Sequence, residues 1–207
     1  MLNKKKGLII FDLDGVLLNS EKNMDYAWTK TCKKLHISIK FDKYKKYVGL
    51  GFFEILKKLR INKNKHLEAY KFYNLYSKNG INKMKLFPHV KKVLKKIKST
   101  YEISLFTSKN KSRVNKILIK FNFNFSKVIT LDDVSKPKPS PEGLNKITKC
   151  FKFKKKDIFY VGDTFYDYKA AQSANINYIH CNWGFKKIKK KIHYINKMND
   201  MVKLLKL

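Results

Sequence analysis

The segment Leu8–Val16, with the sequence LIIFDLDGV, places two aspartates directly after four consecutive apolar residues. A continuous apolar run of this length is typical of a strand that is buried on both faces, as in a parallel sheet. Ligands of open α/β sheets bind beyond the carboxyl ends of such strands, where Asp12 and Asp14 fall. Their i, i+2 spacing directs both carboxylates the same way, so a cation or a shared proton must offset their repulsion. The segment predicts a catalytic position, and a turn that uses Asp and Gly for backbone reasons is the alternative.

A second buried-strand pattern, Ile103–Phe106, ends in the hydroxyls of Thr107 and Ser108. One interpretation of these hydroxyls is the N-cap of a following helix. The other is anion binding, because the unpaired N–H groups at a helix N-terminus already favour a phosphoryl group there. Both interpretations remain open at this point.

The segment Ser135–Glu142, SKPKPSPE, contains three prolines and two lysines. Each proline fixes its own φ and favours extended geometry in the residue before it, so the segment predicts a stiffened loop. Such a loop can hold one lysine in place. Alternatively, it precedes a helix that begins near Pro141, and its lysines are solvated.

The segment Ile158–Asp167, IFYVGDTFYD, runs from a third apolar strand into Asp163, and Asp167 follows four residues later. A favourable interaction with the helix dipole accounts for an acidic residue such as Asp167 in a first helical turn. Asp163 has no such explanation, since it is a bare carboxylate at the end of a buried strand. It therefore indicates a functional site.

These four motifs, in this order and at predicted strand ends, resemble those of the haloacid dehalogenase-like hydrolase superfamily, and the resemblance covers nearly the whole chain. Leu86–Pro88 and Trp183–Phe185 are similar to the phosphoglycolate phosphatase-like and β-phosphoglucomutase-like branch. The resemblance implies an α/β fold: a doubly wound parallel sheet, the Rossmann-like core, with a small inserted α-helical cap. We expect the core to comprise residues 1–18 and 86–207, and the cap residues 19–85.

The resemblance also implies catalytic roles. Asp12 would be the nucleophile that forms an aspartyl-phosphate, which divides one difficult displacement into two easier ones. Asp14 would protonate the leaving oxygen and then deprotonate the attacking water. Thr107 and Lys136 would neutralise charge on the phosphoryl oxygens.

A magnesium ion is the implied cofactor. Asp12, the backbone carbonyl of Asp14, and Asp163 would hold Mg²⁺ together with waters, a ligand set that suits a hard cation. Asp167 is expected to hold Lys136 or a metal-bound water rather than to ligate the metal directly.

The acid at position 14 narrows the expected reaction. Relatives that displace halide resemble this pattern without that acid and without the metal, and the related ion-pumping ATPases carry a threonine there. We expect a magnesium-dependent phosphatase that acts on a small phosphorylated metabolite. A sugar-phosphate mutase of the same superfamily is one alternative, and a basic nucleic-acid-binding or scaffold protein that retains the fold is another.

The inserted segment shows helical spacing of its apolar residues, and Ser20 is a predicted N-cap for its first helix. In the family, such an insertion is a mobile cap that closes over the active site and carries substrate selectivity. Its aromatic residues are explained equally well as the core of the cap.

Four residues are predicted to bind substrate: Ser108 in the core, and Gly49, Phe52 and Phe53 in a cap loop where two glycines let the backbone approach a ligand. Many relatives have an arginine near Phe52 and Phe53, and its absence puts recognition of a carboxylate in doubt. The two rings favour a neutral or partly apolar leaving group, such as a sugar or nucleoside, over a second anion.

Apolar periodicity after the cap alternates between strand and helix, which predicts right-handed βα units and a parallel sheet. The predicted helices are 90–97, 114–121, 141–150 and 168–174, the predicted strands are 103–106, 128–130 and 158–161, and residues 178–181 and 198–205 complete the pattern.

The chain has 48 Lys and Arg residues against 15 Asp and Glu, a net charge of +33. Only Arg60 and Arg113 are arginines, although phosphate and base recognition favours the guanidinium fork. A compositional bias towards lysine and asparagine explains the scattered lysines equally well, and the candidate anionic contacts are the clusters at 152–156 and 186–191. We expect a monomer or weak dimer without specific nucleic-acid binding, whose positive field attracts anionic phosphoesters.

Cys32, Cys150 and Cys181 form no metal-binding or evident disulfide pattern, which is typical of a reduced compartment. No apolar run approaches the length of a membrane span, and the N-terminal apolar stretch is too short for a signal region. These features favour a soluble, cytoplasmic protein.

Overall fold

The computed structural model describes residues 5–188 and 192–207, and its main element is a six-stranded sheet of order β5-β4-β1-β6-β7-β8. Every pairing in this sheet is parallel. The strands are β1 (Leu8–Phe11), β4 (Glu102–Phe106), β5 (Lys127–Ile129), β6 (Ile158–Gly162), β7 (Asn177–Cys181) and β8 (His193–Ile195). Since β1 lies between β4 and β6, the three strands that end in the predicted catalytic motifs are neighbours.

Strand β1 is buried on both faces, as its unbroken apolar run predicts. Ile9 and Phe11 point into one hydrophobic core, and Leu8 and Ile10 point into another on the opposite side of the sheet. This alternation is the two-residue period of a strand. The sheet therefore needs a helical layer on each side.

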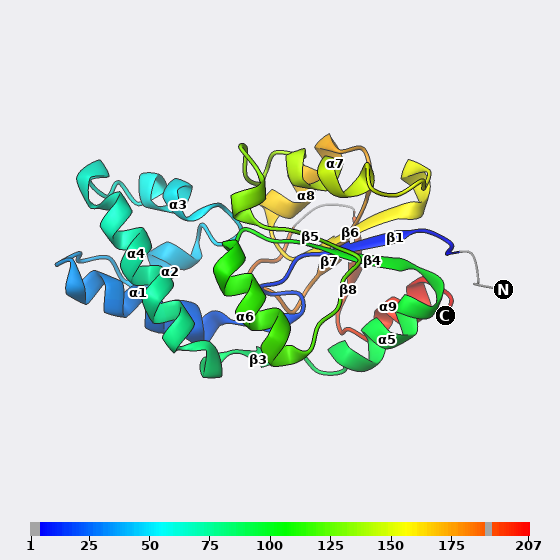
Figure 1. Cartoon of the computed structure of the whole chain (residues 1–207), viewed down its shortest axis with the longest axis horizontal. Helices are drawn as coiled ribbons and strands as arrows, with labels where there is room; N and C mark the ends of the chain where they lie inside the picture. The colour runs from blue at the N-terminus through cyan, green and yellow to red at the C-terminus, as the bar shows by residue number, and fades with distance from the viewer. Residues whose placement is uncertain (1–4, 189–191) are drawn as a thin grey trace.

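Helices cover both faces of the sheet (Figure 1). Residues of α5, α6 and α9 belong to the core around Phe11, and residues of α7 and α8 belong to the core around Ile10. The bounds are α5 Val90–Thr100, α6 Lys111–Phe121, α7 Glu142–Thr148, α8 Phe165–Ser173 and α9 Asp200–Leu204, with short 3-10 turns at Leu131–Asp133 and Lys155–Asp157. The arrangement is a doubly wound α/β fold, which confirms the predicted fold class.

A separate helical lobe lies beyond the carboxyl ends of the strands, at the left of Figure 1. It contains α1 (Glu21–Lys34), α2 (Phe41–Lys45), α3 (Phe52–Lys58) and α4 (His66–Asn79), with 3-10 turns at Lys63–Lys65 and Ile81–Lys83. Its own core is rich in aromatic residues and includes Trp28, Tyr44, Phe52 and Tyr73.

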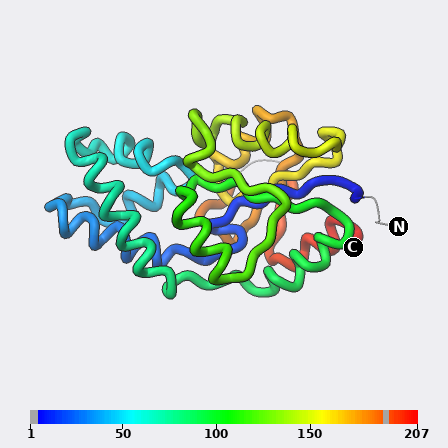
Figure 2. Tube along the Cα trace, viewed as in Figure 1, coloured from blue at the N-terminus to red at the C-terminus, as the bar shows by residue number. Residues whose placement is uncertain are grey.

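The chain leaves the core and returns to it at one place. In Figure 2 it leaves in blue, passes through the lobe in lighter blue to teal, and returns in green. There β2 (Leu18–Asn19) pairs antiparallel with β3 (Lys85–Leu86). This two-stranded connection joins the helical lobe to the α/β core.

The predicted helices and strands after the cap are present, with ends that differ by a few residues. Strand β8 was not predicted, because three residues at the edge of the sheet next to a lysine-rich segment give little periodic signal. Lys189, Lys190 and Lys191 of the second lysine cluster lie outside the described residues. Within the described part of the chain, none of the helices combines the length and the apolar character that crossing a membrane requires.

Candidate active site

Three strand ends bring the predicted catalytic residues together. Phe11 is in register with Leu105 of β4 and with Val161 of β6, so Asp12, Thr107 and Asp163 follow neighbouring strands at the same edge of the sheet. All three side chains are buried. The N–H of Asp12 donates to the Val161 carbonyl at 2.8 Å, which fixes the start of the Asp12 loop to β6.

The lysine that pairs with Asp12 is Lys138, which corrects the prediction of Lys136. Lys138 Nζ donates to Asp12 Oδ1 at 2.8 Å, to Asp167 Oδ1 at 2.8 Å, and to the carbonyl of Phe106 at 3.1 Å. The Lys138 ammonium also lies 4.7 Å from the ring centroid of Phe106 and 5.3 Å from that of Tyr160, within range of cation–π attraction. Lys136, in contrast, has an exposed side chain.

The loop geometry explains why position 138 enters the core. A turn closes from the Ser140 N–H to the Pro137 carbonyl at 3.0 Å, and Lys138 lies within it. Lys136 precedes the turn, and its backbone N–H donates to Glu142 Oε2 at 2.8 Å. Both lysines are followed by a Pro-x-Pro sequence, so the motif fits the chain in two registers and sequence alone does not choose between them.

Asp167 holds the Lys138 ammonium in place beside Asp12. Its Oδ1 accepts from Lys138 and from the Tyr160 hydroxyl at 2.8 Å, and its Oδ2 accepts from the N–H and hydroxyl of Thr164 at 3.0 and 2.6 Å. Burial alone would raise the pKa of Asp167, but the charge of Lys138 and the hydrogen bonds from Lys138, Thr164 and Tyr160 together hold that pKa below its ordinary value. Asp167 is thus both the N-terminal cap partner of α8 and a fixed anion beside Lys138.

Asp163 is a buried acid of the site whose carboxylate has a single hydrogen-bond donor among the described residues. Its Oδ2 accepts from the N–H of Phe185 at 2.6 Å, whereas its buried Oδ1 has no hydrogen-bond partner among the described residues. Gly15 packs so closely that a Cβ there would lie 2.1 Å from Asp163 Oδ2. Burial, reinforced by Asp167 and Asp12, raises the pKa of Asp163 well above its ordinary value.

The acidic cluster fits a divalent cation. Carboxylate oxygens of Asp12, Asp163 and Asp167 can lie within 4.8 Å of one another, and all three residues are buried. Burial raises the pKa of Asp12 to about 7, although Lys138 beside it acts in the opposite direction. Buried polar atoms are nearly always paired, so the free oxygen of Asp163 indicates a place for a cation with oxygen ligands.

Asp14 lies apart from this cluster and has partners of its own. Lys109 Nζ contacts Asp14 Oδ1 at 2.6 Å and Oδ2 at 2.5 Å, and Ser20 Oγ donates to Oδ1 at 2.5 Å. Burial lowers the pKa of Lys109, although Asp14 opposes that shift. Ser20 was expected to cap α1 with its side chain, but its hydroxyl makes no capping hydrogen bond and binds Asp14 instead.

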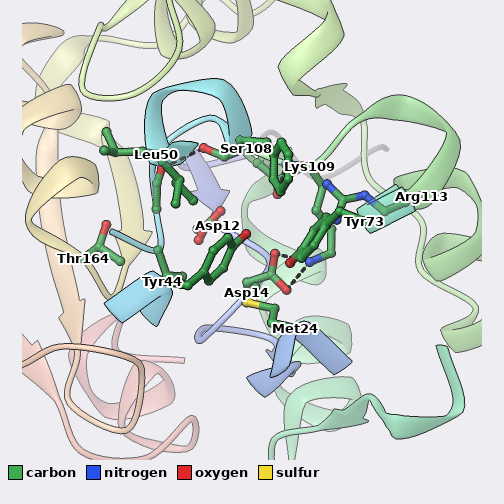
Figure 3. Close-up of a pocket in the computed structure, with 15 residues that line it drawn as sticks. Asp12, Asp14, Met24, Tyr44, Leu50, Tyr73, Ser108, Lys109, Arg113 and Thr164 are labelled. Atoms are coloured by element: carbon green, nitrogen blue, oxygen red, sulfur yellow. Dashed lines mark hydrogen bonds and ion pairs between the residues drawn. The ribbon is translucent and has the colours of Figure 1, made fainter. Parts of the chain in front are cut away.

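A pocket between the core and the helical lobe contains Asp12 and Asp14 (Figure 3). Its core wall includes Thr107, Ser108, Lys109, Arg113 and Thr164, and its other wall consists of Met24, Tyr44, Val48, Gly49, Leu50, Phe52, Ile55 and Tyr73. The empty space between these walls, including the part open to solvent, measures about 500 Å³.

The predicted substrate-binding residues have different positions. Ser108 Oγ donates to the carbonyl of Gly49 at 2.8 Å, a bond that ties the cap loop to the core while both residues line the pocket. Gly49 has a φ of 106°, which only glycine adopts readily, and a Cβ there would lie 2.7 Å from Thr164 Oγ1. Phe52 lines the pocket. Phe53 is absent from the pocket lining and instead stacks on Tyr70, with ring centroids 5.0 Å apart.

Three cations of the site were not predicted from the sequence as site residues: Lys138, Lys109 and Arg113. Lys109 directly follows the two hydroxyls after β4, so its place in the motif was a usable signal. The N-cap of α6 is Asn110, whose side chain accepts from the Arg113 N–H at 3.1 Å, so neither Thr107 nor Ser108 caps that helix. Arg113 lies on the first turn of α6, and its rarity as one of two arginines was the available signal.

The chain matches the family model described as haloacid dehalogenase-like hydrolase over residues 9–181. Among curated proteins, it is 28% identical to the phosphoglycolate phosphatase of Aquifex aeolicus over 204 residues, with 96% of each chain covered. It is 24% identical to the pyrophosphatase PpaX of Bacillus mycoides over 211 residues, with 97% of each chain covered.

Solved structures share the fold. A haloacid dehalogenase-like family hydrolase from Streptococcus pneumoniae superposes with a TM-score of 0.81 at 22% identity, covering 96% of this chain and 98% of the other. A hydrolase from Pseudomonas syringae superposes with a TM-score of 0.87 at 19% identity, covering 97% and 98%. The chain therefore belongs to the haloacid dehalogenase-like hydrolase family, an enzyme family, and to its phosphoglycolate phosphatase-like branch.

Proposed function

We propose that the protein is a magnesium-dependent phosphatase that hydrolyses a small phosphorylated metabolite through an aspartyl-phosphate on Asp12. The observation that carries this proposal is the pairing of Asp12 with Lys138 at 2.8 Å, next to the uncompensated oxygen of Asp163. A nucleophilic carboxylate, a fixed cation and an acidic cluster are the groups that phosphoryl transfer through a carboxylate requires. The curated relatives named above are phosphatases and pyrophosphatases, which agrees with this chemistry.

In the first step, a bond forms between an Asp12 oxygen and phosphorus while the bond from phosphorus to the leaving oxygen breaks. Lys138 fixes the orientation of the Asp12 carboxylate and offers positive charge beside the phosphoryl group. The buried Thr107 side chain in the same pocket can donate a hydrogen bond to a phosphoryl oxygen.

Asp14 transfers the protons in both steps. It donates a proton to the leaving oxygen, and in the second step it takes a proton from the water that attacks the aspartyl-phosphate and releases inorganic phosphate. Lys109 contacts both oxygens of Asp14 and can only donate hydrogen bonds. The Asp14 oxygen that carries the proton must therefore release Lys109, so we expect this ion pair to loosen during turnover.

Asp12 and Asp163 would hold the magnesium ion, with Asp167 acting through Lys138 instead of as a ligand, because its oxygens are already engaged. When bound, the cation would offset the negative charge that the nucleophile and the phosphoryl group bring together. The formation of the bond to phosphorus and the proton transfers depend on Asp12 and Asp14.

We further propose that residues 19–85 act as a cap that closes the site. The Ser108 to Gly49 hydrogen bond and a 3.1 Å hydrogen bond from Asn110 Nδ2 to the Tyr70 hydroxyl join this lobe to the core across the pocket. Closure would exclude water from the site, which strengthens the electrostatic contacts within it.

Hydrolysis of p-nitrophenyl phosphate by the purified protein tests the proposal. We expect turnover with Mg²⁺, loss of turnover with a chelator, and a decrease of at least about 10⁴-fold in kcat for Asp12→Asn, since the amide oxygen is a poor nucleophile. A melting temperature close to that of the wild type would show that Asp12→Asn is folded. Undiminished activity of a folded Asp12→Asn protein would contradict the mechanism.

A further inference from the structure

Arg113 is a buried cation that the proposed chemistry does not use. It lies on the core wall of the pocket and is 6% exposed. Its Nε donates to Asn110 Oδ1 at 3.3 Å, and one terminal nitrogen contacts Ser77 Oγ at 3.5 Å. Its guanidinium carbon lies 5.4 Å from the ring centroid of Tyr73. All of these partners are neutral.

No carboxylate lies within ion-pair distance of Arg113 in the part of the chain that the structure describes. Asp12 and Asp14 share the pocket, and Asp12 pairs with Lys138. Both oxygens of Asp14 are engaged by Lys109, and Ser20 also donates to one of them. This side of the pocket therefore holds two cations and one anion. Figure 3 shows Arg113 beside Tyr73, and the Lys109 ammonium on Asp14.

A purely structural role accounts poorly for this arrangement. Charges are seldom buried without a partner of opposite charge, because desolvation is expensive and neutral contacts repay little of it. The hydrogen bonds of Arg113 to Asn110 and Ser77 are long, and its further partner is the Tyr73 hydroxyl, although a guanidinium offers five donors. The chain has 48 basic residues and only two arginines, yet one of them is in the pocket, where a planar fork that binds carboxylate or phosphate with two hydrogen bonds is useful.

We propose that Arg113 recognises a second anionic group, a carboxylate or a further phosphoryl group, on the leaving part of the substrate. This inference rests on the proposed function and adds the substrate class: a short phosphoester that is anionic at both ends. Asp12 and Lys138 bind one end and Arg113 the other, while Asp14 protonates the oxygen between them. The cap loop lacks an arginine, and helix α6 supplies the charge from the core instead.

A matched pair of substrates tests the proposal directly. Phosphoglycolate carries a carboxylate, and 2-hydroxyethyl phosphate has a neutral hydroxymethyl group at the same place. We expect the wild type to prefer phosphoglycolate by at least about tenfold in kcat/KM, because a site built around a charged hydrogen-bonding group rejects an analogue that lacks the partner. A second comparison, of kcat/KM for pyrophosphate with kcat/KM for p-nitrophenyl phosphate, tests whether the second anionic group is a phosphoryl group.

Arg113→Met should abolish the preference for the anionic substrate, because its kcat/KM for phosphoglycolate should fall by at least about tenfold more than its kcat/KM for 2-hydroxyethyl phosphate. Arg113→Lys should retain part of the preference, because charge remains but the fork is lost. Arg60→Met is the matched control, since Arg60 is exposed, and its preference should equal that of the wild type.

Three results would overturn the inference: a wild type that favours neither anionic substrate, an equal loss on charged and neutral substrates in Arg113→Met, or an unchanged preference in Arg113→Lys. The second result would indicate that Arg113 only joins α6 to the cap.

If Arg113→Met does not fold, the substrate preferences of the wild type and of Arg113→Lys test the inference instead. If no phosphoester is hydrolysed, the proposed function fails, and calorimetric binding of phosphoglycolate and 2-hydroxyethyl phosphate still tests the anion site: equal affinities would contradict it.

Discussion

The two ends of the pocket have opposite charge balances. At one end, Asp12, Asp163 and Asp167 face one cation among the described residues, Lys138. At the other end, Lys109 and Arg113 face one anion of the same described part of the chain, Asp14. Both groups are buried, so water screens neither imbalance well.

This difference indicates what each end lacks. An excess of buried carboxylate is stable only when a cation or protons compensate it, and an excess of buried cation requires an anion. A divalent cation would satisfy the first end, and a second anionic group of the substrate would satisfy the second. The proposed substrate therefore spans the pocket from the Asp12 end to the Arg113 end.

Of the variants that distinguish the two ends of the pocket, we expect the largest effect on kcat/KM from Lys138→Met. Lys138→Met should lower kcat/KM for p-nitrophenyl phosphate by about 10² to 10³-fold, because it removes the fixed cation beside the proposed nucleophile Asp12 and leaves two buried carboxylates without an ion-pair partner. Lys136→Met is the matched control and should change the rate less than about twofold, since the Lys136 side chain is exposed. Inactivation by Lys136→Met with a fully active Lys138→Met protein would reverse the assignment.

A smaller effect, on stability, is expected from Asp163. In the presence of chelator, Asp163→Asn should melt at a higher temperature than the wild type, because the variant no longer buries an uncompensated carboxylate, while Asn can still accept the Phe185 N–H. Adding Mg²⁺ should raise the melting temperature of the wild type by several degrees and leave that of Asp163→Asn unchanged. Asp25→Asn, at an exposed position on α1, should respond to Mg²⁺ like the wild type. A full Mg²⁺ response in Asp163→Asn would remove Asp163 from the proposed metal ligands.

The smallest effect concerns the loop that presents Lys138. Glu142 accepts from the N–H groups of Ser135 and Lys136 and pairs with Lys146, and these contacts, Lys146 first, lower the pKa of Glu142 from 4.5 to about 2. A folded-state pKa below the ordinary value stabilises the protein above pH 4.5, and this contribution is lost as the pH falls towards 2. The wild type should therefore be slightly more stable than Glu142→Gln above pH 4.5, and the two should converge at lower pH. Melting temperatures measured across this range test the sign, and a gap that widens on acidification would contradict it.

Most of the fold was predictable from local patterns. The run before Asp12 has the continuous apolar character of a strand covered on both faces, and the alternation of strand and helix after residue 90 predicts the parallel sheet. Strand β8 and the short helix α2 were not predicted, since a few residues at an edge, or a single helical turn or so among lysines, carry no periodic signal of their own.

Asp12 and Asp163 were predictable because each directly follows a buried strand, where its position is fixed by the sheet. Asp14 and Asp167 follow them within a few residues. The cations were not predictable, because they come from a loop and from a helix start, where the fold decides which side chain points inward. Lys136 and Lys138 are equivalent by motif, and the turn at Pro137 to Ser140 separates them. Likewise, the sequence does not show that Phe53 stacks on Tyr70 while Phe52 faces the pocket.

In the proposed mechanism, Asp12 forms the bond to phosphorus and Asp14 transfers the protons. The direct test is the intact-protein mass spectrum of Asp14→Asn, mixed with Mg²⁺ and p-nitrophenyl phosphate and quenched in acid after a short time. The phenolate leaves without a proton from Asp14, but the hydrolysis step loses its base, so we expect one phosphoryl group to accumulate and peptide analysis to locate it on Asp12. A quenched sample that carries no phosphoryl group while Asp14→Asn turns over at the wild-type rate, or a phosphoryl group on another residue, would contradict the account.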